Sequence, residues 1–296
     1  METVCFVILH FGDSGLTDAA AASILRMEKQ EQIRIVIVDN DIEKPEEERR
    51  AFAGRYRGRP GVTVLPVREN GGFSYANNLG YRYARERLNA SYIILLNNDI
   101  RFTQRNFLSL LEESGRKNPC QVMGPDIVCR KTGIHQNPMD VRIRSRKEAE
   151  YTVRMNRLAL RFYPVVYPAV CWKLERAEKR AVRQSKENEA FYRSIQKDKV
   201  LFGACLIFMP DFVRREEAAF VPETRFFYEE YLLAYRCGKC GYTMGYDPAI
   251  RVIHENGAGT KAAYRQKRQR LRFRLERTAE ACGIYLEVLR EDQDAG

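Results

Sequence analysis

Asn97 and Asp99 carry side-chain oxygens, lie one residue apart and could bind a ligand. They follow an apolar run from Tyr92 to Leu96. A run this short, bounded by polar residues, predicts a strand buried on both faces of a parallel sheet. Ligands of open α/β sheets occupy the crevice beyond the carboxyl ends of the strands, so both side chains would face that crevice. Their oxygens suit a hard divalent cation that also binds substrate phosphates. A helix cap or a left-handed turn would explain the same residues.

Polar residues follow each of the first four predicted strands. The strands are expected at 4–9, 33–38, 62–67 and 92–96, and the residues after them include His10, Asp39, Asn40, Asn70, Gly72, Asn97 and Asn98. The carboxyl ends of parallel strands meet at one edge of a sheet, so these groups should converge there. Asp39 could cap the next helix, or it could accept hydrogen bonds from a nucleobase or a ribose.

Helix-length segments separate these strands, at 17–29, 46–56 and 74–88. The repeated βαβ pattern predicts a mainly parallel, doubly wound sheet with helices on its faces. A helix is expected at 104–118, and further strands are expected at 122–128 and 200–209.

The segment Asn70 to Gly80 leads from a glycine-rich loop into a helix. Adjacent glycines let the backbone approach a ligand, and a helix N-terminus offers free N–H groups to a phosphate or a sugar oxygen. A tight turn with Ser74 as its N-cap explains the glycines and the serine. It does not explain Asn77 and Asn78, one turn into the helix.

These segments resemble the family 2 glycosyltransferases with a GT-A fold, particularly the rhamnosyltransferase-like branch. The resemblance covers about residues 3–128 and 200–260, and it is carried by the asparagine-glycine-phenylalanine loop at Asn70 and by the strand end Leu95 to Asp99. That strand end corresponds to the family's DxD metal motif. The chain departs from the family at His10-Phe11, where tyrosine-asparagine is common, and in its shorter turn at Asp39-Asn40-Asp41.

The resemblance implies roles for residues at the strand ends. It implies a nucleotide-sugar site formed by Asp39, Asn40, Asn70, Gly72, Asn77, Asn97 and Asn98. It also implies a Mg²⁺ or Mn²⁺ site at Asp99, Asn97 and His254, of which the histidine follows the last apolar strand. A lone histidine is otherwise often a structural hydrogen-bonding group, but glycines follow this one, as they do at phosphate-binding strand ends.

The stretch Phe226 to Arg236 resembles the family's acidic motif, with Glu230 at the position of the catalytic base, Glu229 supporting it, and Leu232 in place of a second aspartate. Sugar transfer from a nucleotide diphosphate requires a base for the acceptor hydroxyl and a cation for the leaving diphosphate. Two acids at the start of a helix also have an ordinary explanation, because negative charge stabilises helix N-termini.

Composition and charge limit the class of protein and its possible partners. The 296 residues are 45% hydrophobic, as in a folded protein, and the net charge of +11 indicates anionic partners. Neither a long apolar span nor a signal peptide is evident, so we expect a cytoplasmic protein, with the inner face of the membrane as a second location. Eight cysteines are expected as reduced thiols. The CxxC at Cys237 to Cys240 lacks the second ligand pair of a zinc site.

Two segments lie outside the resemblance. Residues 139–199 are rich in charge and predict a helical insertion, either a solvated face or a cap on the acceptor or membrane side. The tail 261–296 predicts a basic helix, because Lys261 to Arg277 carries eight Lys or Arg against Glu276 alone. The helix could simply be solvated, and contact with an anionic membrane is the favoured functional interpretation. Nucleic acid is not expected, because aromatic residues are not interleaved with the basic ones.

These observations predict a GT-A glycosyltransferase domain at 1–260 followed by the tail. We expect it to be inverting and metal-dependent, and to move a sugar from a nucleotide-diphosphate donor to a saccharide or lipid-linked saccharide in cell-surface polysaccharide synthesis. Two alternatives remain. A non-catalytic nucleotide-sugar-binding module would bind the donor without turnover, and a nucleic-acid-binding protein would show salt-dependent affinity for RNA or DNA.

Overall fold

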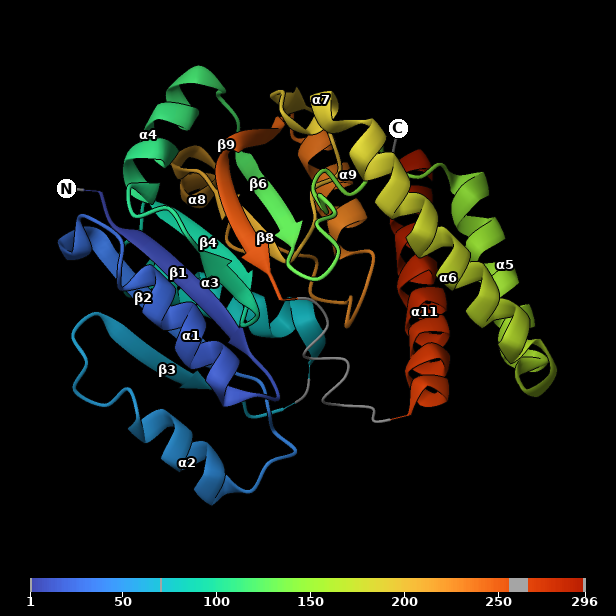
Figure 1. Cartoon of the computed structure of the whole chain (residues 1–296), viewed down its shortest axis with the longest axis horizontal. Coiled ribbons are helices and arrows are strands. Elements are labelled where there is room, and N and C mark those ends of the chain that lie inside the picture. The colour runs from blue at the N-terminus through green and yellow to red at the C-terminus, as the bar shows by residue number, and fades with distance from the viewer. Residues whose placement is uncertain (1, 70, 256–265, 295–296) are drawn as a thin grey trace.

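A mixed β-sheet lies at the centre of the structure, a computed structural model that describes residues 2–69, 71–255 and 266–294 (Figure 1). Among these residues the strands follow the order β3-β2-β1-β4-β8-β6-β9-β5, with β7 paired to β9. Their bounds are β1 Val4–His10, β2 Ile33–Asp39, β3 Val62–Pro66, β4 Tyr92–Asn97, β5 Ile100–Phe102, β6 Val122–Cys129, β7 Gln196–Lys197, β8 Cys205–Phe208 and β9 Met244–His254.

The first four strands of the sheet are parallel, as predicted. β1 pairs with β2 on one side and with β4 on the other, and β2 pairs with β3. Antiparallel pairing begins at β8, which lies between β4 and β6. The prediction of a mixed, mainly parallel sheet flanked by helices, as in the GT-A fold, is confirmed.

Helices cover both faces of the sheet. They are α1 Ser14–Ile24, α2 Glu46–Gly54, α3 Gly72–Glu86, α4 Phe107–Lys117, α5 Arg146–Arg161, α6 Tyr163–Glu187, α7 Glu189–Tyr192, α8 Pro210–Arg215, α9 Glu229–Lys239 and α11 Lys267–Asp294. A 3₁₀ turn occupies Gln30–Gln32. In β1, Phe6 and Ile8 join the core under α1, α2 and α4, whereas Val7 joins the core under α3, α8 and α9. Both faces are therefore apolar, which explains the continuous apolar runs in the sequence.

Close packing of α3 on the sheet requires a glycine. A Cβ at Gly80 would lie 2.3 Å from Cγ1 of Val7 and 2.7 Å from Cγ2 of Val38. The helix can therefore approach β1 and β2 only where this side chain is absent.

The helical insertion and the helical tail pack together beside the sheet. α5, α11 and the start of α9 share an apolar core that includes Ala149, Tyr231, Cys282 and Tyr285 (Figure 1). Helices occupy the insertion and the tail, and the described part of the tail begins at residue 266. The division into a domain at 1–260 and a separate tail remains a prediction.

Some predicted bounds differ from the observed ones. α1 begins at Ser14 rather than Thr17, because the Asp13 side chain accepts from the Gly15 amide and caps the helix. The strand expected at 200–209 is reduced to β8. Upstream of β8, the backbone amides of Phe202 and Gly203 donate to side chains instead of to a neighbouring strand.

All eight cysteines are free thiols, as predicted. Burial raises the pKa of several of them, including Cys205, and disfavours their reactive thiolate form. None of the helices described is both long and apolar enough to cross a bilayer.

Candidate active site

Asp99 and His254 meet at the end of the sheet. β5 follows Asp99 directly and pairs with β9, and that register places Ile100 opposite His254. Oδ1 of Asp99 lies 3.2 Å from Nε2 of His254, and both side chains are buried. Nδ1 of His254 lies 2.7 Å from Oε1 of Gln136. Because an amide oxygen only accepts hydrogen bonds, Nδ1 is the donor in this contact, and Nε2 is the ring nitrogen that faces Asp99.

This pair fits part of a divalent cation site. A carboxylate oxygen and an imidazole nitrogen are suitable donors for Mn²⁺, and a cation that keeps waters and binds a diphosphate needs only one or two protein ligands. Asn97, the third predicted ligand, ends β4 and is half-buried. Within the described ranges, no group of three or more His, Cys, Asp and Glu could form a closed metal site. The predicted set therefore suits an open site shared with a substrate.

Glu229 and Glu230 begin α9 after an unusual turn. Phe227 and Tyr228 both have left-handed backbones, with φ of 68° and 63°, which costs energy for residues with large side chains. Both carboxylates are buried. Oε1 of Glu230 accepts from the amide of Gly203 at 3.2 Å. Oε2 of Glu229 has no hydrogen-bond partner in the described part of the chain.

Burial changes the ionisation of both acids. Desolvation and then the nearby charge of Glu230 raise the pKa of Glu229 well above its ordinary value. Desolvation also raises the pKa of Glu230, and the Gly203 amide partly opposes this effect by stabilising the carboxylate. Glu230 is therefore the acid of the pair that ionises more readily. A buried acid with a raised pKa suits a general base.

One short segment contacts both groups. Gly203 donates to Glu230, and the neighbouring Phe202 has its ring centroid 6.0 Å from that of His254. The next residue, Ala204, accepts from the amide of Asn97 at 3.0 Å. A Cβ at Gly203 would lie 3.0 Å from Oε1 of Glu230. Residues 202–204 thus bring together Glu230, the histidine and the end of β4.

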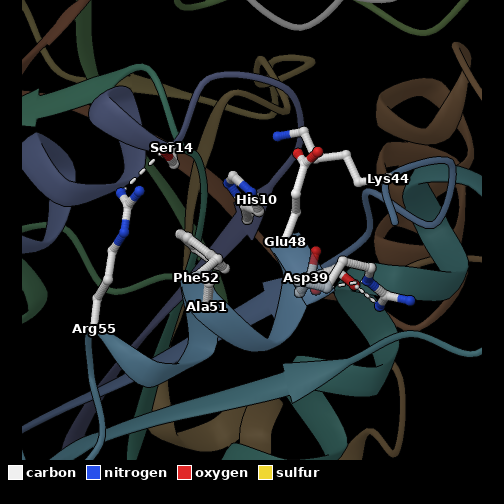
Figure 2. A pocket seen from close by; sticks show the side chains of 9 residues that line it. His10, Ser14, Asp39, Lys44, Glu48, Ala51, Phe52 and Arg55 are labelled. Carbon is white, nitrogen blue, oxygen red and sulfur yellow. Dashed lines mark hydrogen bonds and ion pairs between the residues drawn. The ribbon is translucent and has the colours of Figure 1, made fainter. Parts of the chain in front are cut away.

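A pocket of about 180 Å³ lies at the ends of β1 and β2, against α2 (Figure 2). His10 lies in its middle, stacked on Phe52 with ring centroids 4.0 Å apart. Burial lowers the pKa of His10 to about 4, with a smaller opposing effect from Asp39, so the ring is neutral at pH 7. Nε of Arg49 lies 2.9 Å from Oδ2 of Asp39 and pairs with this carboxylate.

The predicted nucleotide residue Asp39 therefore has partners already. Its Oδ1 accepts from the amide of Asp41, and its Oδ2 accepts from Arg49. A carboxylate has about four acceptor sites, so further hydrogen bonds from a ligand are compatible with this geometry. Next to it, Oδ1 of Asn40 is buried without a partner among the described residues.

The chain matches a known protein family. The model of Glycosyl transferase family 2 matches residues 6–172, more than half of the chain. The chain belongs to glycosyl transferase family 2. The match includes Asp39, Asp99 and the helix α3, but it ends before Glu229, Glu230 and His254.

Solved structures similar to this family 2 chain include residues 1–349 of TarS from S. aureus, also in complex with UDP and with UDP-GlcNAc. The identity is 11% and the TM-score is 0.37, with 44% of this chain covered. The alignment spans 36% of the TarS chain in the first two structures and 35% in the third. No curated protein matches the chain.

Two asparagines predicted at the donor site make hydrogen bonds within the protein. Nδ2 of Asn98 donates to Thr17 Oγ1 and to the carbonyl of Phe11, which holds the loop after β1. Nδ2 of Asn77 donates to the carbonyl of Phe73 one turn earlier. Both side chains are buried. Their role in donor binding remains a prediction, and Asn70 lies outside the described residues.

The start of α3 packs against the chain before α9. A Cβ at Gly72, whose φ is 85°, would lie 2.5 Å from the backbone of Arg225. Oγ of Ser74 lies 2.8 Å from Oγ1 of Thr224.

The side chain of Asn78 donates to the Phe220 carbonyl and accepts from the Phe220 amide. Asn78 therefore has a positioning role, which the tight-turn interpretation of this segment did not explain.

Sequence reasoning missed Gln136 and Arg49. Gln136 accepts from Nδ1 of His254 and orients its ring, and Arg49 pairs with Asp39. Arg49 follows Asp39 by ten residues on an acidic and basic helix, where its charge gave no distinct signal. Gln136 lies in a loop, and no motif marks it.

Proposed function

We propose that this protein transfers a sugar from a nucleotide-diphosphate donor to a hydroxyl of a saccharide or lipid-linked saccharide, with inversion at the anomeric carbon. The main support for the proposal is that residues 202–204 contact His254, the backbone of Asn97 and Glu230. The proposed cation ligands and the proposed base thus lie on either side of one segment that has little side-chain bulk at Gly203.

In the proposed reaction, Glu230 accepts the proton of the acceptor hydroxyl as that oxygen bonds to the anomeric carbon. The bond from this carbon to the diphosphate oxygen breaks, and the nucleoside diphosphate leaves with the electron pair. Glu229 keeps its proton. Its Oε2, which has no hydrogen-bond partner among the described residues, would form a hydrogen bond with the acceptor saccharide. A Mg²⁺ or Mn²⁺ bound at Asp99, His254 and Asn97 would neutralise charge on the leaving diphosphate.

The donor base would lie at the pocket formed by His10, Asp39 and Phe52. A stacked, neutral histidine on an aromatic ring gives a flat apolar surface for a base. The buried Oδ1 of Asn40 and the remaining acceptor sites of Asp39 would accept from base or ribose donors. Asn77, Asn98, Asn70 and Gly72 would complete the donor site on the side of α3.

Finer features of the proposal follow the resemblance stated from the sequence. They are the rhamnosyltransferase-like branch, a hexose or rhamnose donor, a role in cell-surface polysaccharide synthesis, and a cytoplasmic location with access to the inner membrane face. The basic tail would contact an anionic membrane there.

Thermal unfolding with a panel of nucleoside diphosphates and nucleotide sugars, with and without Mn²⁺, tests the donor site. A ligand at one hundred times its Kd stabilises the folded state by about 2.7 kcal/mol, which should raise Tm by roughly 5 °C or more. We expect a metal-dependent increase with one nucleotide class, and we expect Asp99→Ala to abolish it. No shift with any nucleotide would refute the donor site, and binding without turnover would identify a non-catalytic module.

A further inference from the structure

Apolar side chains are exposed at the turn between α5 and α6. Leu158, Phe162 and Val165 have relative exposures of 48%, 48% and 81%. Tyr151 and Met155 precede Leu158 on α5 at helical spacing, and both are exposed. We name Leu158, Phe162 and Val165 the turn patch. Adjacent exposed apolar side chains of this size indicate an interaction surface.

Arginines surround the turn patch. The described residues include no ion-pair partner for Arg154, Arg157 or Arg161, although the Arg161 guanidinium lies 5.7 Å from the ring centroid of Phe162. With Arg290 they line a shallow groove of about 650 Å³ between α5 and α11. The acids that line this groove are Glu150 and Glu287, and Glu150 already pairs with Arg146. The groove therefore has a net positive charge.

The basic start of α11 lies against the same turn. The hydroxyl of Tyr163 donates to the Arg268 carbonyl at 2.6 Å, and the Arg268 guanidinium covers the rings of Tyr163 and Tyr167. α11 begins beside the turn from α5 into α6 in Figure 1. The exposed Arg272 and Arg274 follow on this part of α11. Apolar and cationic side chains from three helices are therefore gathered at one end of the helical group.

We propose that the turn patch and the arginines around it dock the protein onto an anionic lipid bilayer. Interfacial helices place aromatic and aliphatic side chains at the boundary between headgroups and acyl chains, and they place arginines against lipid phosphates. The net charge of +11 also favours binding to an anionic lipid surface. A second copy of the chain fits less well, because a symmetric contact would place these arginines against themselves. The proposal goes beyond sugar transfer and does not depend on it.

Sedimentation with vesicles tests the proposal directly. We expect the full chain to bind vesicles of equimolar phosphatidylcholine and phosphatidylglycerol, to release on addition of salt, and not to bind phosphatidylcholine alone. Phe162→Asp with Val165→Asp should weaken binding by about tenfold or more, because it places charge in the apolar region. The matched control Ile195→Asp adds a charge at another exposed apolar residue and should bind as wild type does.

Charge reversal and fluorescence give two independent measurements. Arg157→Glu with Arg161→Glu should also weaken binding by roughly tenfold or more, whereas the exposed Arg82→Glu on α3 should have little effect. Trp172 on α6, the only tryptophan, is 60% exposed, and its emission should shift to shorter wavelength on anionic vesicles. Circular dichroism checks that each variant is folded. If a variant does not fold, the Trp172 emission of the wild-type protein still tests the proposal, because that measurement needs no substitution.

Three results would overturn the proposal. The first is wild-type protein that stays in solution with anionic vesicles. The second is a folded turn-patch variant that binds them as wild type does. The third is a wild-type dimer, seen by light scattering, that the turn-patch variant converts to a monomer without any lipid binding, which would identify a self-association face. Binding to anionic vesicles with no sugar transfer would leave the docking proposal intact and refute only the proposed function.

Discussion

Replacing Glu229 and Glu230 by glutamine, one at a time, separates an acid that stays protonated from one that ionises. Burial and the charge of Glu230 raise the pKa of Glu229 most, so Glu229 is expected to keep its proton. Because glutamine resembles a protonated glutamate, Glu229→Gln should change kcat by about threefold at most. Glu230→Gln removes the base and should lower kcat by roughly 10² to 10⁴-fold.

The pH dependence of turnover tests the same assignment. A base works only when deprotonated, so kcat should rise with pH. Its midpoint should lie above the ordinary glutamate pKa of about 4.3, because burial raises the pKa of Glu230. Release of nucleoside diphosphate, measured across the pH range for wild type and Glu229→Gln, should give the same rising limb for both.

Stability provides a second measurement on this pair. Between the unfolded and the folded pKa of a glutamate whose pKa is raised by folding, the folded state binds more protons than the unfolded state. The contribution of the pair to the free energy of unfolding is therefore largest below the unfolded pKa of about 4.3, and it falls as pH rises toward the folded pKa, by about 1.4 kcal/mol for each pKa unit. Glu229→Gln removes this cost and should raise Tm above neutral pH by roughly 2–4 °C per kcal/mol. The assignment is refuted if Glu229→Gln loses as much activity as Glu230→Gln.

Two further predictions concern groups that position the site. The pKa of His10 is lowered to about 4 by burial, so the unfolded state binds more protons between this value and about 6.5. Stability should therefore fall by about 3 kcal/mol as pH drops through that range, and His10→Gln should remove most of this dependence in denaturant titrations. Asn78→Ala leaves both backbone groups of Phe220 unpaired and should lower the free energy of unfolding by roughly 2–4 kcal/mol. A loss below 0.5 kcal/mol, roughly the scale of a surface substitution, would show that Asn78 does not hold the Phe220 loop.

The sheet and its polar edge could be predicted from the sequence because local patterns determine them. The apolar run before Asn97 and the alternation of strands with helices are features of neighbouring residues, and they gave four parallel strands in their observed places. The antiparallel insertion of β8 between β4 and β6 could not be predicted in this way, because it depends on pairing between residues more than eighty positions apart.

Within the candidate site, residue types were easier to predict than partners. Asp99 and His254 were each chosen for a position at a strand end, and β5 brings them together by pairing with β9. The role of Asn78 could not be predicted, since its amide could equally bind a sugar or a backbone. Only the folded chain shows Phe220 beside it. The exposure of hydrophobic residues such as Val165 could not be predicted, because burial depends on which helix face the rest of the chain covers.

The contact between the Gly72 loop and residues 220–225 has a consequence for building hybrid enzymes. Three separate attachments, at Arg225, Thr224 and Phe220, join α3 to the chain that leads into Glu229. Exchanging the segment before α9 alone, to change the acceptor, would leave Gly72, Ser74 and Asn78 facing unmatched neighbours. A graft that carries residues 71–80 and 218–230 together keeps all three attachments, so these two stretches form one exchangeable unit although about 140 residues separate them.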